Sequence, residues 1–353
     1  MRVSAFSILL LPGDGIGPEV VAAAERVLRA VADRDHHQLE LTTGVIGGAA
    51  LKQGKPPLPD ATLDAARAAD GILLGAVGDP SFDTAPPSER PEAALLKLRR
   101  ELGLYANLRP ARVWPGLETA GPLKPEVLAG TDLLLFRELT GGLYYGEPRG
   151  QSADSAHNTM RYSREEIERI ARRAFEAARL RRKRVTSVDK ANVLEVSRLW
   201  RQVVTAVAKE YPDITLDHML VDTCAMRIAY APSSFDVILT ENMFGDILSD
   251  EAGAVVGSLG LLPSASLGDG AGLFEPVHGS APDIAGKGIA NPIATIASAA
   301  MLLRYALKLD AEAAKVEAAV EAVLRAGLRT ADLAAGGPSV STTEMTERIV
   351  AAL

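Results

Sequence analysis

The sequence lacks the features of a disulfide-stabilised, cysteine-rich or membrane-spanning protein. It has one cysteine, Cys224, which excludes an intramolecular disulfide and a cysteine-based zinc cluster. Such low cysteine content fits a reducing cytosol, and we expect a cytoplasmic location. No apolar stretch reaches 18 residues without a charge or a helix breaker, so we expect no transmembrane segment. The apolar run from Ile8 to Leu11 is also too short for the hydrophobic region of a signal sequence.

The sequence also lacks an excess of positive charge. It has 38 basic and 45 acidic residues, which give a formal net charge of −7. There is therefore no general electrostatic attraction to nucleic acid or to an anionic membrane, and we expect neither as a partner. The 353 residues can bury a large core and should form about two domains.

Apolar strands alternate with amphipathic helices along the N-terminal part of the chain. A predicted strand from Val3 to Leu11 precedes a predicted helix from Pro18 to Val31, and further pairs follow, which favours an α/β architecture. The link between the first strand and helix reads G-x-G-x-G-P from Gly13 to Pro18. That spacing differs from the G-x-G-x-x-G of a Rossmann phosphate loop and indicates a tight strand-to-helix turn instead.

Two aspartates follow a buried strand predicted at residues 235–240. Asp246 stands where a helix N-cap is expected, and Asp250 would lie on the same helix face, about 40° away. Neighbouring carboxylates repel unless a cation lies between them, and all-oxygen ligands suit Mg²⁺ or Mn²⁺. The alternative is one capping and one solvated aspartate. Asp222 follows another apolar run and stands where the N-cap of the next helix is expected, so it is a third carboxylate at a strand end.

Three arginines are candidates for binding carboxylates. Arg99 shares a stripe of the helix predicted at 91–103 with Leu95 and Leu96, whereas Arg109 and Arg137 follow short apolar runs. Arginine binds planar carboxylates through two parallel hydrogen bonds. The alternative is that the leucines are core positions and the charges are solvated.

Several irregular segments separate these elements. Glycines flank Tyr144 and Tyr145, which suggests an arm or hairpin at a subunit interface, and Lys190 follows a predicted strand. A lysine at a strand end is usually solvated and acts as a base only where its site is enclosed. Residues 77–91 form a long loop with four prolines, and 278–292 are too rich in glycine for a regular element. Two alanine-rich helices, predicted at 292–309 and 311–326, close the fold.

Together, these motifs resemble the β-decarboxylating dehydrogenases, the family of isocitrate and 3-isopropylmalate dehydrogenases. The resemblance covers essentially the whole chain and lies in segments 13–19, 107–110, 137–142, 188–194, 244–250 and 278–292. It implies a two-domain α/β fold of the isopropylmalate dehydrogenase type that is not a Rossmann fold. A discontinuous first domain, residues 1–104 and 257–353, would bind the cofactor. Residues 105–256 would form a second domain with the dimer interface and the arm.

The resemblance also implies roles for individual residues. Tyr144 and Lys190 would be catalytic, and the cofactors would be NAD and Mg²⁺ or Mn²⁺. Lys190 and Asp222 would reach the active site from the other subunit of a homodimer. The metal would be held by Asp222, Asp246 and Asp250. The substrate would contact Leu95, Leu96, Arg99, Arg109, Arg137 and Asp222. The cofactor would contact Glu92, His278, Gly279, Ser280, Ala281, Asp283, Ile284 and Asn291.

Two positions distinguish between members of this family. Isocitrate-using relatives carry a serine and an asparagine where this chain has Ala93 and Leu95, so the resemblance favours an isopropyl-bearing substrate. Asp283 and Ile284 match the NAD-type pattern, which NADP users replace by lysine and tyrosine. We therefore expect NAD-dependent decarboxylation of 3-isopropylmalate to 4-methyl-2-oxopentanoate and CO₂, a step of leucine biosynthesis. The alternatives are a sibling enzyme acting on malate, tartrate or homoisocitrate, and a non-catalytic regulatory subunit.

Overall fold

The computed structural model describes residues 5–353, so the predicted start of the first strand at Val3 lies outside the described residues. The chain forms two compact units. Unit 1 contains the chain up to Leu104, Trp114–Ala120 and Gly257–Leu353, and unit 2 contains Tyr105–Val113 and Gly121–Val256. The sequence-based boundaries assigned 114–120 to the second domain. This segment belongs to unit 1, where Arg329 donates a hydrogen bond to the carbonyl of Gly116.

Unit 1 is built on strands in the order β2-β1-β3-β12-β11. Neighbouring strands are parallel except for β11 and β12, which pair antiparallel. All six residues of β3 are buried, as expected for a strand covered on both faces. The strands are β1 (Ala5–Gly13), β2 (Gln38–Thr43), β3 (Gly71–Ala76), β11 (Pro263–Leu267) and β12 (Gly272–Pro276).

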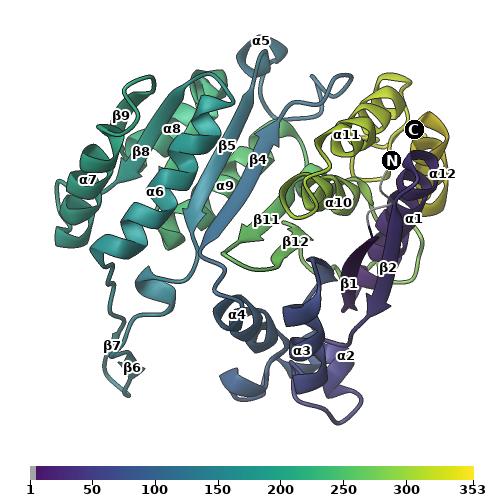
Figure 1. The fold of residues 1–353 in the computed structure, drawn as a ribbon, viewed down its shortest axis with the longest axis horizontal. Helices are drawn as coiled ribbons and strands as arrows, with labels where there is room; N and C mark the ends of the chain where they lie inside the picture. The colour runs from purple at the N-terminus through teal and green to yellow at the C-terminus, as the bar shows by residue number, and fades with distance from the viewer. Residues whose placement is uncertain (1–4) are drawn as a thin grey trace. The chain divides into compact units, whose positions relative to one another are not determined.

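Helices cover both faces of the unit 1 strands. The chain moves from β1 outward to β2 and then back to β3, so right-handed crossovers place α1 and α3 on opposite faces. Every residue from Ile293 to Leu303 of α10 is buried, and α1, α11 and β12 all contact this helix (Figure 1). The helices are α1 (Gly17–Asp35), α2 (Gly48–Leu51), α3 (Asp60–Ala68), α4 (Pro91–Glu101), α10 (Ile293–Tyr305), α11 (Asp310–Arg325) and α12 (Thr342–Ala352). The sequence-based assignment missed α12.

Unit 2 has strands in the order β4-β5-β10-β8-β9, with β4 antiparallel to β5 and the other neighbours parallel. The strands are β4 (Ala106–Arg112), β5 (Asp132–Glu138), β8 (Arg184–Asp189), β9 (Thr215–Leu220) and β10 (Val237–Thr240). The helices are α5 (Pro125–Leu128), α6 (Arg164–Arg179), α7 (Glu195–Ala208), α8 (Val221–Tyr230) and α9 (Asn242–Val256). The alternation of parallel strands and helices confirms the predicted α/β class.

The connections in unit 2 also reverse direction. The chain runs outward from β5 through β8 to β9 and then returns to β10, so α8 lies on the face opposite α6 and α7. Helix α8 packs against α9. A short hairpin of β6 (Gly150–Gln151) and β7 (Ala156–His157) extends from this unit, and residues 147–158 are all exposed (Figure 1). No helix within residues 5–353 is long and apolar enough to cross a membrane.

Candidate functional site

The two aspartates lie on α9, although this helix starts earlier than its sequence pattern indicates. Glu241, directly before α9, accepts hydrogen bonds from the backbone N–H groups of Met243 (3.1 Å) and Phe244 (2.7 Å). This carboxylate satisfies backbone N–H groups of the first turn of α9. The prediction of Asp246 as the N-cap is therefore wrong, and Asp246 lies in the second turn of the helix. The predicted spacing of four residues between Asp246 and Asp250 on one face is unaffected.

Two of the three predicted arginines contact this acidic face. Arg137, near the end of β5, donates from Nη1 to Asp246 Oδ1 at 2.5 Å. Arg109 in β4 donates from Nη1 to Asp250 Oδ1 at 3.1 Å, and the same nitrogen lies 3.4 Å from Asp246 Oδ1. Gly245 permits this approach, because a Cβ there would lie 2.8 Å from the Cβ of Arg137. The fold thus unites two arginines and two aspartates from distant parts of the sequence.

Tyr144 completes this cluster. It ends a short 3-10 helix, η3 (Gly142–Tyr144), and its hydroxyl donates to Asp246 Oδ2 at 3.0 Å. The Arg137 guanidinium lies 5.7 Å from the centre of its ring. Partial burial, together with the charge of Asp246, raises the pKa of the Tyr144 phenol above its usual value. The phenol is therefore protonated at neutral pH and can donate a proton.

Lys190 and Asp222 form a separate pair in unit 2. Lys190 follows β8, and its Nζ lies 2.5 Å from Asp222 Oδ1, where its hydrogen bond lowers the pKa of that carboxyl. Asp222 is the second residue of α8 and Leu220 is the N-cap, so the prediction of Asp222 as a cap is wrong. Across residues 5–353, no three histidine, cysteine, aspartate or glutamate side chains gather as a metal-binding group. A single chain therefore does not assemble the predicted three-aspartate set.

In unit 1, Arg99 is held by a glutamate that sequence reasoning missed. Arg99 Nη2 lies 2.7 Å from Glu275 Oε1, and both side chains are almost completely buried. Its Nε is also buried and has no hydrogen-bond partner among the described residues. On the same helix, α4, Leu95 is half-buried and Leu96 is 43% exposed. Arg99 and these leucines therefore leave a donor and an apolar surface for a ligand.

The glycine turn before α1 supports the loop at 278–291. The N–H of Ile16 donates to the carbonyl of Ser280 at 2.8 Å. Gly15 has a φ of +57°, and a Cβ there would lie only 1.9 Å from the same carbonyl oxygen. Ala281 and Ile284 pack against Ile16 and its buried neighbours. This turn therefore fixes the position of the loop, which fits the tight strand-to-helix turn expected from the sequence.

The loop presents polar groups at its two ends. His278 Nδ1 lies 2.9 Å from the carbonyl of Gly279, whereas its buried Nε2 has no hydrogen-bond partner in the described part of the chain. Burial lowers the pKa of His278, so its ring is neutral at pH 7. Asn291 is fixed by Asp332, to which it donates at 3.1 Å. The unpartnered His278 nitrogen therefore leaves one polar group available for a hydrogen bond to a ligand.

The long loop at 77–91, which includes the 3-10 helices η1 (Pro80–Phe82) and η2 (Pro87–Glu89), meets the same region. A Cβ at Gly78 would lie 3.3 Å from Ser280 Oγ and 3.4 Å from Glu92 Oε1. Asp14, which sequence reasoning did not single out, is buried and accepts hydrogen bonds from three backbone N–H groups. These donors are Gly48, Ala49 and Gly78. Asp14 thus ties together the loops after β1, β2 and β3.

Known proteins resemble this chain over almost its entire length. The sequence pattern of the family described as isocitrate/isopropylmalate dehydrogenase matches residues 7–349. A 3-isopropylmalate dehydrogenase of Shouchella clausii is 58% identical, over 98% of this chain and 97% of that protein. One from Aquifex aeolicus is 55% identical, over 98% and 96%. The crystal structure of an isocitrate dehydrogenase from Methylococcus capsulatus superposes with a TM-score of 0.87 at 41% identity, over 98% of this chain and 99% of that one.

These comparisons confirm the family and the fold that the motifs predicted. They come from sequence patterns and from solved structures independently, and both cover more than nine-tenths of the chain. The chain belongs to the isocitrate/isopropylmalate dehydrogenase family.

Proposed function

We propose that this protein catalyses the NAD-dependent oxidative decarboxylation of 3-isopropylmalate to 4-methyl-2-oxopentanoate and CO₂, in the cytoplasm, as a step of leucine biosynthesis. The observation that carries the proposal is the half-exposed apolar surface of Leu95 and Leu96 on α4, one turn from buried Arg99. An apolar surface beside a guanidinium fits a dicarboxylate that carries a branched alkyl group. The high identity to 3-isopropylmalate dehydrogenases supports the same substrate.

Different side chains of the protein would bind different parts of such a substrate. Arg99, Arg109 and Arg137 would bind its carboxylates. In the proposed complex, Arg109 and Arg137 exchange part of their contact with Asp246 and Asp250 for the substrate, because a guanidinium has five donors and can serve two acceptors. The leucines would contact the isopropyl group, whose burial is worth about 1.5–3 kcal/mol.

Asp246 and Asp250 fit one side of a divalent-cation site. They present carboxylate oxygens on one helix face, and their side chains are 32% and 57% exposed. Such oxygen ligands suit Mg²⁺ or Mn²⁺. We propose that Asp222 of a second subunit supplies the third carboxylate. When bound, the cation would lower the pKa of the substrate hydroxyl and polarise the ketone formed from it.

Lys190 and Tyr144 are the proposed proton-transfer groups. Lys190, also from the second subunit, would accept the proton of the substrate hydroxyl, directly or through a relay, as hydride passes to NAD⁺. Tyr144 would then protonate the carbon that has lost CO₂, since its raised pKa keeps the phenol protonated until that step. Asp246 holds the Tyr144 hydroxyl in place for this transfer.

A homodimer would bring Lys190 and Asp222 of one subunit to the arginines, Tyr144 and α9 aspartates of the other. The exposed arm at 147–158 supports this proposal, because a two-stranded hairpin is marginally stable alone in water. Helices α8 and α9 also carry exposed apolar side chains, with Met226 65%, Tyr230 60% and Ile247 60% exposed. Apolar side chains gathered on packed helices are typical of a subunit interface.

The substrate assignment is tested by comparing 3-isopropylmalate, isocitrate, malate and tartrate in an assay of NADH formation with Mg²⁺. We expect kcat/KM for 3-isopropylmalate to be at least about a hundredfold above the others, because the apolar contact favours the branched group. Activity led by malate or tartrate would retain the mechanism and reject the substrate. A folded dimer inactive with all four substrates would instead indicate a regulatory subunit.

NADP⁺ should be a poor replacement for NAD⁺. We propose that the cofactor binds the 278–291 loop, with Glu92 and the 77–91 loop near its nicotinamide half. Asp283 is exposed on that loop and would accept from the ribose hydroxyls, whereas it would repel a 2′-phosphate. We expect kcat/KM to favour NAD⁺ by about a hundredfold or more, and Asp283→Asn to reduce that ratio. Equal values for the two cofactors in the wild-type enzyme would refute this role.

A further inference from the structure

We propose that Asn242 is a positioning residue that fixes Arg137 and the Tyr144 segment in one arrangement. This inference rests on the proposed function, because it concerns how that site is held ready for substrate. Asn242 begins α9, and its side chain is completely buried. A buried carboxamide retains its position only where its donors and acceptor are satisfied, and its partners here are parts of the proposed site.

The two ends of the Asn242 carboxamide contact different parts of the site. Its Oδ1 accepts a hydrogen bond from Arg137 Nε at 2.9 Å. Its Nδ2 donates to the carbonyls of Leu139 (3.0 Å) and Gly141 (3.1 Å), in the segment that leads to Tyr144. Because Arg137 Nη1 and the Tyr144 hydroxyl both meet the carboxylate of Asp246, Asn242 closes a ring of contacts around these groups.

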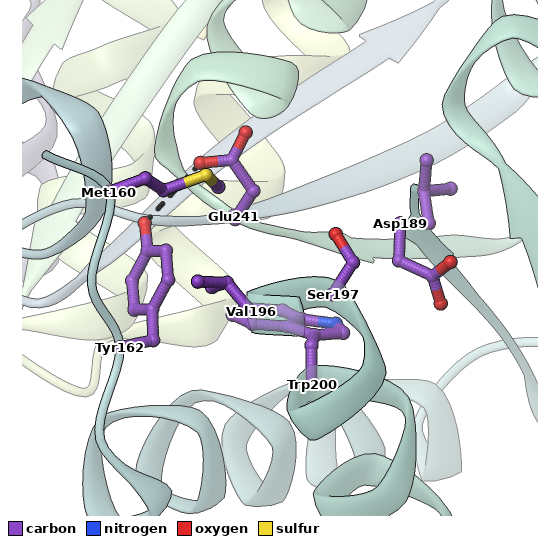
Figure 2. Close-up of a pocket in the computed structure, with 8 residues that line it drawn as sticks. Met160, Tyr162, Asp189, Val196, Ser197, Trp200 and Glu241 are labelled. Carbon is purple, nitrogen blue, oxygen red and sulfur yellow. Dashed lines mark hydrogen bonds between the residues drawn. The ribbon is translucent and has the colours of Figure 1, made fainter. Parts of the chain in front are cut away.

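Tyr162 contacts both Asn242 and the segment that leads to Tyr144. The backbone N–H of Asn242 donates to the Tyr162 hydroxyl at 3.0 Å. Figure 2 shows that hydroxyl directed at the carboxylate of Glu241, at the edge of a pocket that Trp200 also lines. A Cβ on Gly141 would lie 2.5 Å from the Tyr162 ring, and one on Gly142 would lie 2.4 Å from its hydroxyl. The segment therefore rests directly on Tyr162, and Asn242 fastens it there.

Arg109 has a similar support that serves as a comparison. Its Nε donates to Oδ1 of buried Asn107 at 2.9 Å, and Asn107 lies opposite Arg137 in the β4–β5 pairing. Both arginines are thus gripped at Nε by a buried asparagine, which directs their terminal nitrogens to the aspartates of α9. Asn242 differs because its amide also holds the Tyr144 segment. Its loss should consequently affect both substrate binding and the chemical step.

The test separates these two effects with Asn242→Asp and Asn242→Ala. The aspartate retains an acceptor for Arg137 Nε but loses the donor to Leu139 and Gly141. We expect Asn242→Asp to keep KM for 3-isopropylmalate within about threefold and to lower kcat by about ten- to a hundredfold, because a small displacement of a reacting group has a large effect on rate. Asn242→Ala loses both contacts, so its KM should also rise by about tenfold or more.

Val204→Ala is the control for general destabilisation. Val204 is completely buried on α7, and truncating it should lower the melting temperature while kcat and KM stay near wild type.

Hydrogen exchange of residues 139–146, followed by mass spectrometry, gives a readout that does not need activity. Exchange there should accelerate in both Asn242 variants and stay unchanged in Val204→Ala.

The possible outcomes test the role of Asn242 separately from the proposed enzymatic function. Unchanged kcat, KM and hydrogen exchange in folded Asn242 variants would overturn the role of Asn242. The same conclusion would follow if Val204→Ala, at an equal melting temperature, showed the same changes in kcat, KM and exchange. If Asn242→Asp does not fold, Asn242→Ala carries the test against the same control. If the wild-type protein does not turn over 3-isopropylmalate, the proposed function fails, and exchange at 139–146 still accepts or rejects Asn242 as the anchor.

Discussion

Replacing Lys190 with methionine should lower kcat for 3-isopropylmalate by about a hundredfold to ten-thousandfold, the range of a lost general base. Methionine retains the length of the side chain but cannot accept a proton. Lys190 and Asp222 are partly exposed, with side chains 29% and 60% accessible, so losing their ion pair should alter folding little. Steady-state kinetics and the melting temperature test both expectations. Near-normal turnover would reject Lys190 as the base.

Mixed dimers test whether Lys190 and Tyr144 act across the subunit boundary. Subunits with Lys190→Met can be mixed with subunits carrying Tyr144→Phe after reversible dissociation. If the two residues meet across the interface, each heterodimer has one intact site and one with both defects. Random mixing should then restore about a quarter of wild-type activity, since about half the dimers are mixed. If both residues act within one subunit, activity should stay at the level of the parent variants.

Replacing Asp246 with asparagine should have the second largest effect, because this carboxylate has several partners. It contacts Arg137, Arg109 and the Tyr144 hydroxyl and is a proposed metal ligand. Asparagine has the same shape but no charge. We expect Mn²⁺ affinity to fall by about tenfold to a hundredfold and kcat/KM by about a hundredfold or more. Titration calorimetry with Mn²⁺ measures the first value, and kinetics at saturating Mg²⁺ measure the second.

Asp217→Asn is the matched control for this substitution. Asp217 lies on β9, is 40% exposed at its side chain and pairs with Arg184 at 3.4 Å, away from the proposed ligands. The Asp217→Asn substitution removes the same charge but does not touch the proposed site. Metal affinity and turnover should therefore stay at the wild-type level. The metal-ligand role of Asp246 would be untenable if the two variants behaved alike.

Local sequence patterns determined the class of the fold and the helix face that carries the aspartates. Asp246 and Asp250 lie on one face because their spacing matches the helical period, wherever the helix begins. The spacing from Gly13 to Pro18 likewise argued against a phosphate loop, because turn conformation depends on residues close together in the chain. Family motifs suggested the residue roles proposed here, which periodicity and spacing alone left open.

Tertiary structure decided how these residues are held. The pairing of Arg99 with Glu275 joins positions 176 residues apart, and the contact of Arg137 with Asn242 joins positions 105 apart. Neither partner is marked by a local pattern, because a buried hydrogen bond between distant elements depends on strand order and helix placement. The start of α9 was misjudged for a different, local reason. Glu241 accepts hydrogen bonds from the backbone N–H groups of Met243 and Phe244, so the helix begins ahead of Asp246. The sequence thus determined which chemical groups are present, and the packing of strands and helices decided which of them meet.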